Sequence, residues 1–113
     1  MIEIWHNPRC SKSRQTLQLL QDRGIDPQVR LYLIDAPDMA ALRDMASALG
    51  GGAVDMMRPK DTLFKELGLT KDTGDAALFA AMSANPSLIE RPIVCKDGNA
   101  AIGRPPESVL DIL

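Results

Sequence analysis

An α/β fold with a mixed four-stranded sheet is predicted by the order of hydrophobic patterns along this 113-residue chain. Three observations carry the prediction: a strand–helix–strand pattern at the start, a helical stretch in the middle, and a β-hairpin followed by a helix at the end. We expect one domain over residues 1–113, with the helical stretch inserted at about residues 36–90.

The first part of the chain predicts a strand, a helix and a second strand. Residues 2–5 form a short apolar run that an Asn-Pro pair ends. Between residues 11 and 23 the apolar and small side chains recur at helical spacing, and Gly24 ends this helix. A second apolar run at residues 29–34 predicts the second strand.

The middle of the chain predicts helices. Pro37 lies near the start of a helix with a clear apolar face, and the three glycines at residues 50–52 end it. Residues 53–90 contain two apolar clusters at helical spacing and no strand pattern. This stretch therefore predicts short helices.

The last part of the chain predicts a hairpin and a closing helix. Residues 92–95 and 99–102 are joined by a turn that contains Asp-Gly, which suits a tight β-hairpin. Residues 105–113 predict a helix whose first turn tolerates proline. The order β-α-β, helical insert, β-β-α is the thioredoxin-like arrangement.

Composition excludes several classes of protein. The net charge of −2 argues against a general nucleic-acid binder. No apolar run is long enough to span a bilayer, and the first residues lack the zones of a signal peptide. We therefore expect a cytoplasmic protein with reduced thiols. Two cysteines and one histidine without close Cys spacing do not make a zinc site, so we expect no metal.

Cys10 is the candidate nucleophile. It follows the first strand and lies at the predicted start of the first helix, where partial positive charge and free N–H groups stabilise a thiolate. Arg9, Lys12 and Arg14 add positive charge nearby, and serines at positions 11 and 13 can donate hydrogen bonds. The sole histidine, His6, can orient the loop or help to deprotonate the thiol. The alternative is a cysteine that only fills space at a strand–helix junction.

The residues after Cys10 separate it from two other thiol chemistries. Ser13 stands where a dithiol oxidoreductase has its second cysteine, so the site lacks a resolving partner. Thr16 stands where cysteine-dependent phosphatases place a phosphate-binding arginine. Cys95 lies in a predicted core strand and is interpreted as a small buried hydrophobic residue. A redox reaction at Cys10 would then need an external thiol.

Three arginines share one sequence context. Arg58, Arg91 and Arg104 are the arginines beyond residue 43, and each precedes a proline, which restricts the backbone of the preceding residue. In a thioredoxin-like fold the Arg91-Pro92 position lies beside the start of the first helix. Guanidinium groups bind tetrahedral oxyanions through paired hydrogen bonds, so the three predict a pocket for a small anion. The alternative is that they are solvated surface residues.

The motifs "HNPRCSKSR", "RPK…LFKELGL", "NPSLIERPIV" and "IGRPPESVLDIL" together resemble the glutaredoxin-linked ArsC-type arsenate reductases over nearly the whole chain. The chain is most similar in length to the shorter, chromosomal members of that family. The resemblance implies that Cys10 attacks arsenate to form a Cys–S–As adduct, while Arg58, Arg91 and Arg104 bind the oxyanion. It also implies that His6 and Ser13 support the thiolate.

The resemblance further implies how the adduct is resolved. Glutathione would attack it as the external reductant, and glutaredoxin would reduce the mixed disulfide and release arsenite. No bound cofactor or metal is expected. Two other functions stay open: an Spx-like regulator that binds RNA polymerase, and a thiol oxidoreductase that acts on glutathione mixed disulfides. Spx-type proteins generally carry Cys-x-x-Cys and lack the arginine of "GRPPE", so Ser13 and Arg104 favour the enzyme.

Overall fold

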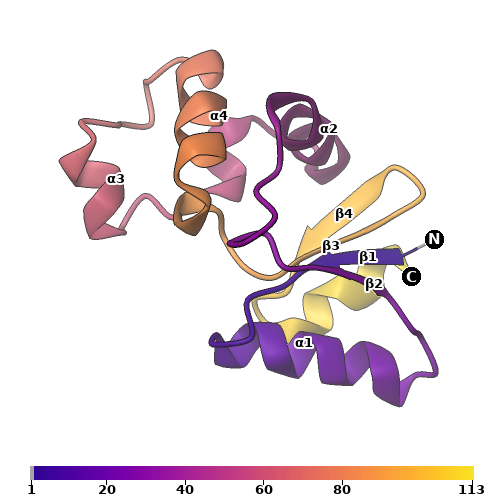
Figure 1. Cartoon of the computed structure of the whole chain (residues 1–113). Coiled ribbons are helices and arrows are strands. Elements are labelled where there is room, and N and C mark those ends of the chain that lie inside the picture. The colour runs from indigo at the N-terminus through magenta and orange to yellow at the C-terminus, as the bar shows by residue number, and fades with distance from the viewer. Residues whose placement is uncertain (1) are drawn as a thin grey trace. The chain divides into compact units, whose positions relative to one another are not determined.

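The computed structural model describes residues 2–113, which divide into two compact units (Figure 1). The first unit combines residues 2–35 with residues 91–113, and the second contains residues 36–90. The second unit covers the segment that the sequence predicts as a helical insert. The expectation that residues 1–113 form a single domain stays a prediction.

The first unit is built on a mixed four-stranded sheet in the order β2-β1-β3-β4. Strand β1 pairs in parallel with β2 and antiparallel with β3, and β3 forms an antiparallel hairpin with β4. The predicted mixed sheet is therefore confirmed. The strands are β1 (Ile2–Trp5), β2 (Gln28–Arg30), β3 (Ile93–Lys96) and β4 (Asn99–Ile102).

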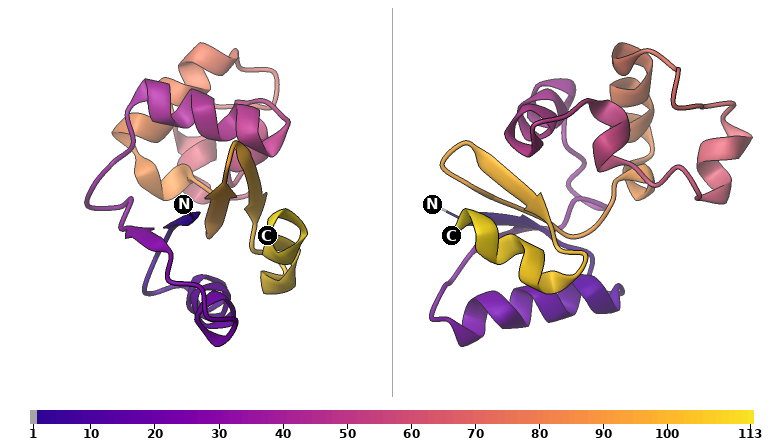
Figure 2. Two further views of the ribbon diagram at one scale, coloured as in Figure 1. Left: turned by 90° about the vertical axis from the view of Figure 1, so that its right-hand side faces the viewer. Right: turned by 180° about the vertical axis from the view of Figure 1, so that it is seen from behind.

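Two helical segments cover one face of this sheet. Helix α1 (Ser11–Asp22) and the 3₁₀ segment η3 (Pro106–Ile112) lie side by side on that face (Figure 2). Their apolar side chains and those of the central strands form one core, because burial of aliphatic surface favours this packing. The fully buried members of that core are Ile4, Leu20, Val94 and Val109.

The second strand is shorter than the sequence predicts. It ends at Arg30, and residues 31–34 form a turn in which the N–H groups of Ile34 and Asp35 bond to the Leu31 carbonyl. Pairing stops because β1 ends there: His6 N–H donates the last bond, to the Arg30 carbonyl at 2.9 Å, before the chain turns at an Asn-Pro pair. The expectation of a strand over residues 29–34 is therefore wrong beyond residue 30.

The closing segment is a 3₁₀ helix rather than an α-helix. Ser108 N–H bonds to the Pro105 carbonyl at 3.0 Å, three residues back. Pro106 fits the start of this segment, because the first N–H groups of a helix have no partner within it. The predicted position of a helical segment at the end of the chain is confirmed.

The second unit is helical, as the sequence predicts. Asp38 caps its first helix by accepting a hydrogen bond from the Ala41 N–H, and Gly50 ends that helix with φ of 79°. Among residues 2–113, no helix is both long enough and apolar enough to cross a membrane. The helical segments are α2 (Met39–Leu49), η1 (Ala53–Met56), α3 (Thr62–Glu66), α4 (Asp75–Ala84) and η2 (Pro86–Leu88).

Candidate active site

The loop between β1 and α1 places Cys10 at the N-cap of the first helix. The Cys10 backbone is extended, its N–H donates to the Asn7 carbonyl at 3.0 Å, and its carbonyl accepts the Arg14 N–H, the first bond of the helix. The first turn of α1 contains no acidic residue. The Cys10 sulfur therefore lies at the positive end of a helix dipole without a competing carboxylate.

The surroundings of Cys10 lower the pKa of its thiol. Partial burial of the side chain opposes ionisation, but it is outweighed by hydrogen bonding from the Ser13 backbone N–H, the Arg91 guanidinium and the Lys12 backbone N–H, and by the Arg91 charge. The thiolate is the nucleophilic form of cysteine, so a lowered pKa increases the reactive fraction at neutral pH.

Two of the three predicted arginines meet at this sulfur. Arg91 hydrogen-bonds to Cys10, and Nη2 of Arg104 lies 3.6 Å from Cys10 Sγ. Arg104 Nε also donates to the Arg91 carbonyl at 2.8 Å, so the two arginines are linked directly. Both peptide bonds that follow them, to Pro92 and Pro105, are cis. The first unit thus carries one cysteine thiol, with a lowered pKa, flanked by two guanidinium groups.

Close approach at Gly103 brings Arg104 to the helix. Gly103 is buried, and its N–H donates to the Pro92 carbonyl at 2.9 Å. A Cβ at this position would overlap Thr16 Oγ1 and lie 2.8 Å from Pro92 Cγ. Only glycine lets the chain pass between α1 and the Arg91-Pro92 segment at this separation.

We expect Gly103→Ala to destabilise the first unit and to displace Arg104 from the sulfur. Overpacking of this kind costs about 1–3 kcal/mol, to be measured as the free energy of unfolding in urea. Gly74→Ala is the control for an added methyl group without overlap, because no atom lies within 4 Å of a Cβ there and φ is −60°. As the N-cap of α4, this position adds only the cost of a weaker cap, which falls on the second unit. Equal stability of the Gly103→Ala and wild-type proteins would contradict the close approach.

His6 and Ser13 form a buried hydrogen-bonded pair behind the loop. His6 Nδ1 and Ser13 Oγ are 2.6 Å apart, and Ser13 Oγ also accepts the Asn7 N–H at 3.0 Å. Burial, together with the charge of Arg14, lowers the pKa of His6 and favours a neutral imidazole. His6 can either orient the loop or help to deprotonate the thiol, and its contact with Ser13 supports the first role. Ser13 stabilises the Cys10 sulfur through a hydrogen bond from its backbone N–H.

The lowered pKa of His6 predicts a loss of stability in mild acid. An unfolded chain binds a proton at His6 near pH 6.5, whereas the folded chain resists it until lower pH, so stability is fully present above 6.5 and decreases as the pH falls below that value. His6 is the sole histidine in the chain. Urea unfolding at pH 7.5 and pH 5.5 should show this loss in the wild type and a smaller one in His6→Gln. Identical pH dependence in both proteins would exclude the effect.

The side chains of the remaining candidate cations do not contact the Cys10 sulfur through any interaction described for residues 2–113. Arg14 Nη1 donates to the Pro8 carbonyl at 2.9 Å, and the Arg9 N–H donates to Asn7 Oδ1 at 3.0 Å. Arg58 belongs to the second unit, where Nη1 lies 3.1 Å from an Asp61 carboxylate oxygen and Nε lies 3.8 Å from a Glu90 carboxylate oxygen. Its part in an anion site stays a prediction.

Cys95 differs from Cys10 in position and in electrostatics. It lies in β3, as the sequence predicts, but it is only partly buried, whereas the sequence predicts a small buried hydrophobic residue. Burial and the negative charge of Glu3, its neighbour across the sheet, raise the pKa of the Cys95 thiol. Both cysteines are free thiols.

Sequence reasoning missed two residues that position the site. Asn7 shapes the loop through both its backbone and its side chain, as described above, and Gly103 permits the approach of Arg104. An asparagine before a proline is a common turn signal and does not reveal which N–H groups it organises. Gly103 and Thr16 are far apart in the chain but close in space, so no local sequence pattern indicates that a Cβ at residue 103 would overlap Thr16.

The fold and the site define a thioredoxin-like protein in which a cysteine of lowered pKa lies beside two linked arginines. The family model for the ArsC family matches residues 5–112, so the chain belongs to the ArsC family.

Individual relatives are similar over nearly their whole length. The uncharacterized protein YfgD of Escherichia coli K12 is 52% identical, covering 99% of this chain and 96% of that protein. An arsenate reductase of Neisseria meningitidis serogroup A is 50% identical, covering 99% and 97%. The solved structure of an arsenate reductase from Vibrio cholerae has a TM-score of 0.96 at 52% identity, covering 99% and 97%.

Proposed function

We propose that this protein is an arsenate reductase in which Cys10 is the nucleophile and Arg91 and Arg104 bind the oxyanion. The observation that carries the proposal is the Cys10 thiol at a helix N-terminus, with a lowered pKa and two guanidinium groups at its sulfur. Membership of the ArsC family and the names of relatives about 50% identical over the full length support arsenate as the substrate.

In the first step the Cys10 thiolate attacks the arsenic atom of arsenate. A sulfur–arsenic bond forms, one arsenic–oxygen bond breaks, and the departing oxygen leaves as water after protonation. The guanidinium groups neutralise charge on the remaining oxygens, since planar N–H donors match the edges of a tetrahedral oxyanion. The backbone N–H groups of Ser13 and Lys12 hold the sulfur before attack.

In the second step an external thiol completes the two-electron reduction. The sulfur of glutathione attacks Cys10 Sγ, the sulfur–arsenic bond breaks, and its electron pair stays on arsenic, which leaves as arsenite. In this scheme arsenite leaves when glutathione attacks, one step earlier than the resemblance implies, and glutaredoxin then reduces the Cys10–glutathione disulfide. The raised pKa of Cys95 makes it a poor internal substitute for this thiol. A cytoplasmic location, where glutathione keeps thiols reduced, belongs to the same proposal.

Arg58 is the third oxyanion ligand in this proposal. Its guanidinium is paired with carboxylates within the second unit, so binding arsenate requires it to exchange or share these partners. Arsenate carries more negative charge than either carboxylate alone, which favours exchange of the longer, 3.8 Å pair with Glu90.

The test is oxidation of NADPH coupled through glutathione reductase, glutathione and glutaredoxin, with and without arsenate. An arsenate-dependent rate is the expected result. A rate with a glutathione mixed disulfide but none with arsenate would assign the protein to thiol oxidoreductases. Absence of both rates, together with tight binding to RNA polymerase, would assign it to regulators of the Spx type.

A further inference from the structure

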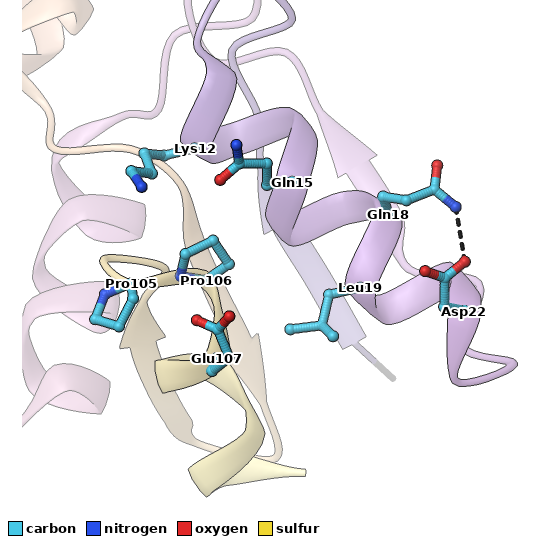
Figure 3. Close-up of a pocket in the computed structure, with 8 residues that line it drawn as sticks. All are labelled: Lys12, Gln15, Gln18, Leu19, Asp22, Pro105, Pro106 and Glu107. Atoms are coloured by element: carbon cyan, nitrogen blue, oxygen red, sulfur yellow. Dashed lines mark hydrogen bonds between the residues drawn. The ribbon is translucent and has the colours of Figure 1, made fainter.

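A groove runs along α1, and its lining includes Lys12 and Pro105, which are close in the chain to Cys10 and Arg104. It has a volume of about 460 Å³, within the range of roughly 300–1,000 Å³ that small-molecule sites occupy. One wall comes from α1 and the other from the start of η3 (Figure 3). Its lining is Lys12, Gln15, Gln18, Leu19, Asp22, Pro105, Pro106 and Glu107, all in the first unit.

Each wall of the groove includes a residue that is close in the chain to a site residue. Lys12 is two residues from Cys10, and its backbone N–H acts on the Cys10 sulfur. Pro105 directly follows Arg104, whose guanidinium lies 3.6 Å from that sulfur. These neighbours of Cys10 and Arg104 connect one end of the groove to the loop that carries the sulfur.

The polar groups of the groove suit a short zwitterionic peptide. The Lys12 ammonium lies at the end of the groove formed by the start of α1, and the Glu107 carboxylate lies farther along (Figure 3). Within the described residues 2–113, neither group forms an ion pair, whereas Gln18 Nε2 and Asp22 Oδ1 are joined by a 2.8 Å hydrogen bond at the far end. The Gln15 amide can both donate and accept, as peptide amides require.

The apolar part of the groove matches the rest of such a ligand. Leu19 extends from α1 toward Glu107, and Pro105 and Pro106 face it from the opposite wall (Figure 3). These side chains offer a surface to methylene groups, while the charged groups fix the ends of the ligand.

We propose that this groove is the subsite for the thiol reductant, and that it binds glutathione with a carboxylate on Lys12 and the ammonium on Glu107. The inference rests on the proposed function only for the identity of the second substrate. It gives Glu107 a role in specificity for the thiol: the residue selects a charged peptide thiol over a small neutral one and leaves the arsenate site unchanged.

The direct test is binding of S-methylglutathione, which cannot form a disulfide, to the ¹⁵N-labelled full chain. We expect amide shift changes at Lys12, Gln15, Leu19 and Glu107. Glu107→Lys should raise the dissociation constant about tenfold, because attraction for the ammonium becomes repulsion. Glu66→Lys is the matched control at an exposed position in α3 and should bind like the wild type. Shift changes elsewhere, or unchanged affinity in Glu107→Lys, would overturn the assignment.

A kinetic test separates recognition of the thiol from a structural effect. Glu107→Lys should raise the KM for glutathione about tenfold while the KM for 2-mercaptoethanol, which lacks both charged groups, stays unchanged. Equal increases for both thiols would overturn the proposal, and so would an increase confined to the KM for glutaredoxin, which would make the groove a protein-docking surface. Binding of S-methylglutathione without any arsenate turnover would refute the proposed function and leave the groove assignment standing.

Discussion

Replacement of Cys10 by serine is expected to abolish arsenate-dependent turnover, with a loss of more than about 10³-fold, because the reaction loses its only nucleophile. A serine hydroxyl at the same N-cap stays protonated at neutral pH and cannot accept the sulfur–sulfur bond that the second step requires. The substitution should leave the stability of the fold nearly unchanged, because the side chain of Cys10 is not part of the buried core of the first unit. Turnover is measured in the coupled assay.

Cys95→Ser is the control for the loss of a thiol. Cys95 is only partly buried in β3, and the pKa of its thiol is raised, so most turnover should remain. If Cys95→Ser were as inactive as Cys10→Ser, the second cysteine would take part in the reaction and the requirement for an external thiol would be wrong.

Loss of either active-site arginine is expected to weaken oxyanion binding strongly. A hydrogen bond to a charged group contributes about 1.5–3 kcal/mol, which corresponds to roughly 10- to 150-fold in affinity. Arg104 is exposed, so Arg104→Ala should fall near the lower figure, whereas the partly buried Arg91 should give the larger effect. Arg91→Ala should also raise the pKa of Cys10, because Arg91 is among the groups that lower it.

Binding of arsenate and of sulfate, an unreactive tetrahedral anion, measures this effect without turnover. Arg23→Ala is the matched control: Arg23 is exposed at the opposite end of α1, and its removal changes the net charge by the same amount. Wild-type affinity for both anions in the Arg91 and Arg104 variants would refute the anion site, and an equal loss in Arg23→Ala would reduce it to a general charge effect.

The secondary structure elements that depend on local hydrophobic patterns could be predicted from the sequence. Alternation of apolar runs and turn residues predicts the four strands and helix α1, and the position of Cys10 at the start of that helix follows from the same pattern. The second strand was predicted too long, because a run of apolar residues cannot show where its partner strand stops. Leu33 and Ile34 remain exposed beyond that point.

The sequence predicts which residue types form the site, but it does not predict which hydrogen bonds they make. Proline after Arg91 and Arg104 marks both residues, and the structure brings both to the sulfur. The hydroxyl of Ser13 was expected near the sulfur, yet it bonds to His6 and Asn7, because the buried imidazole and loop N–H need partners.

The central claim is that Cys10 is an ionised thiol held by a helix N-terminus and arginines. Titration of thiolate absorbance at 240 nm in the Cys95→Ser protein tests it most directly, because Cys10 is then the sole thiol. We predict a pKa below the ordinary value of about 8.5, and a higher pKa when Arg91 is replaced by alanine. A midpoint at or above the ordinary value, unaffected by Arg91, would contradict the account.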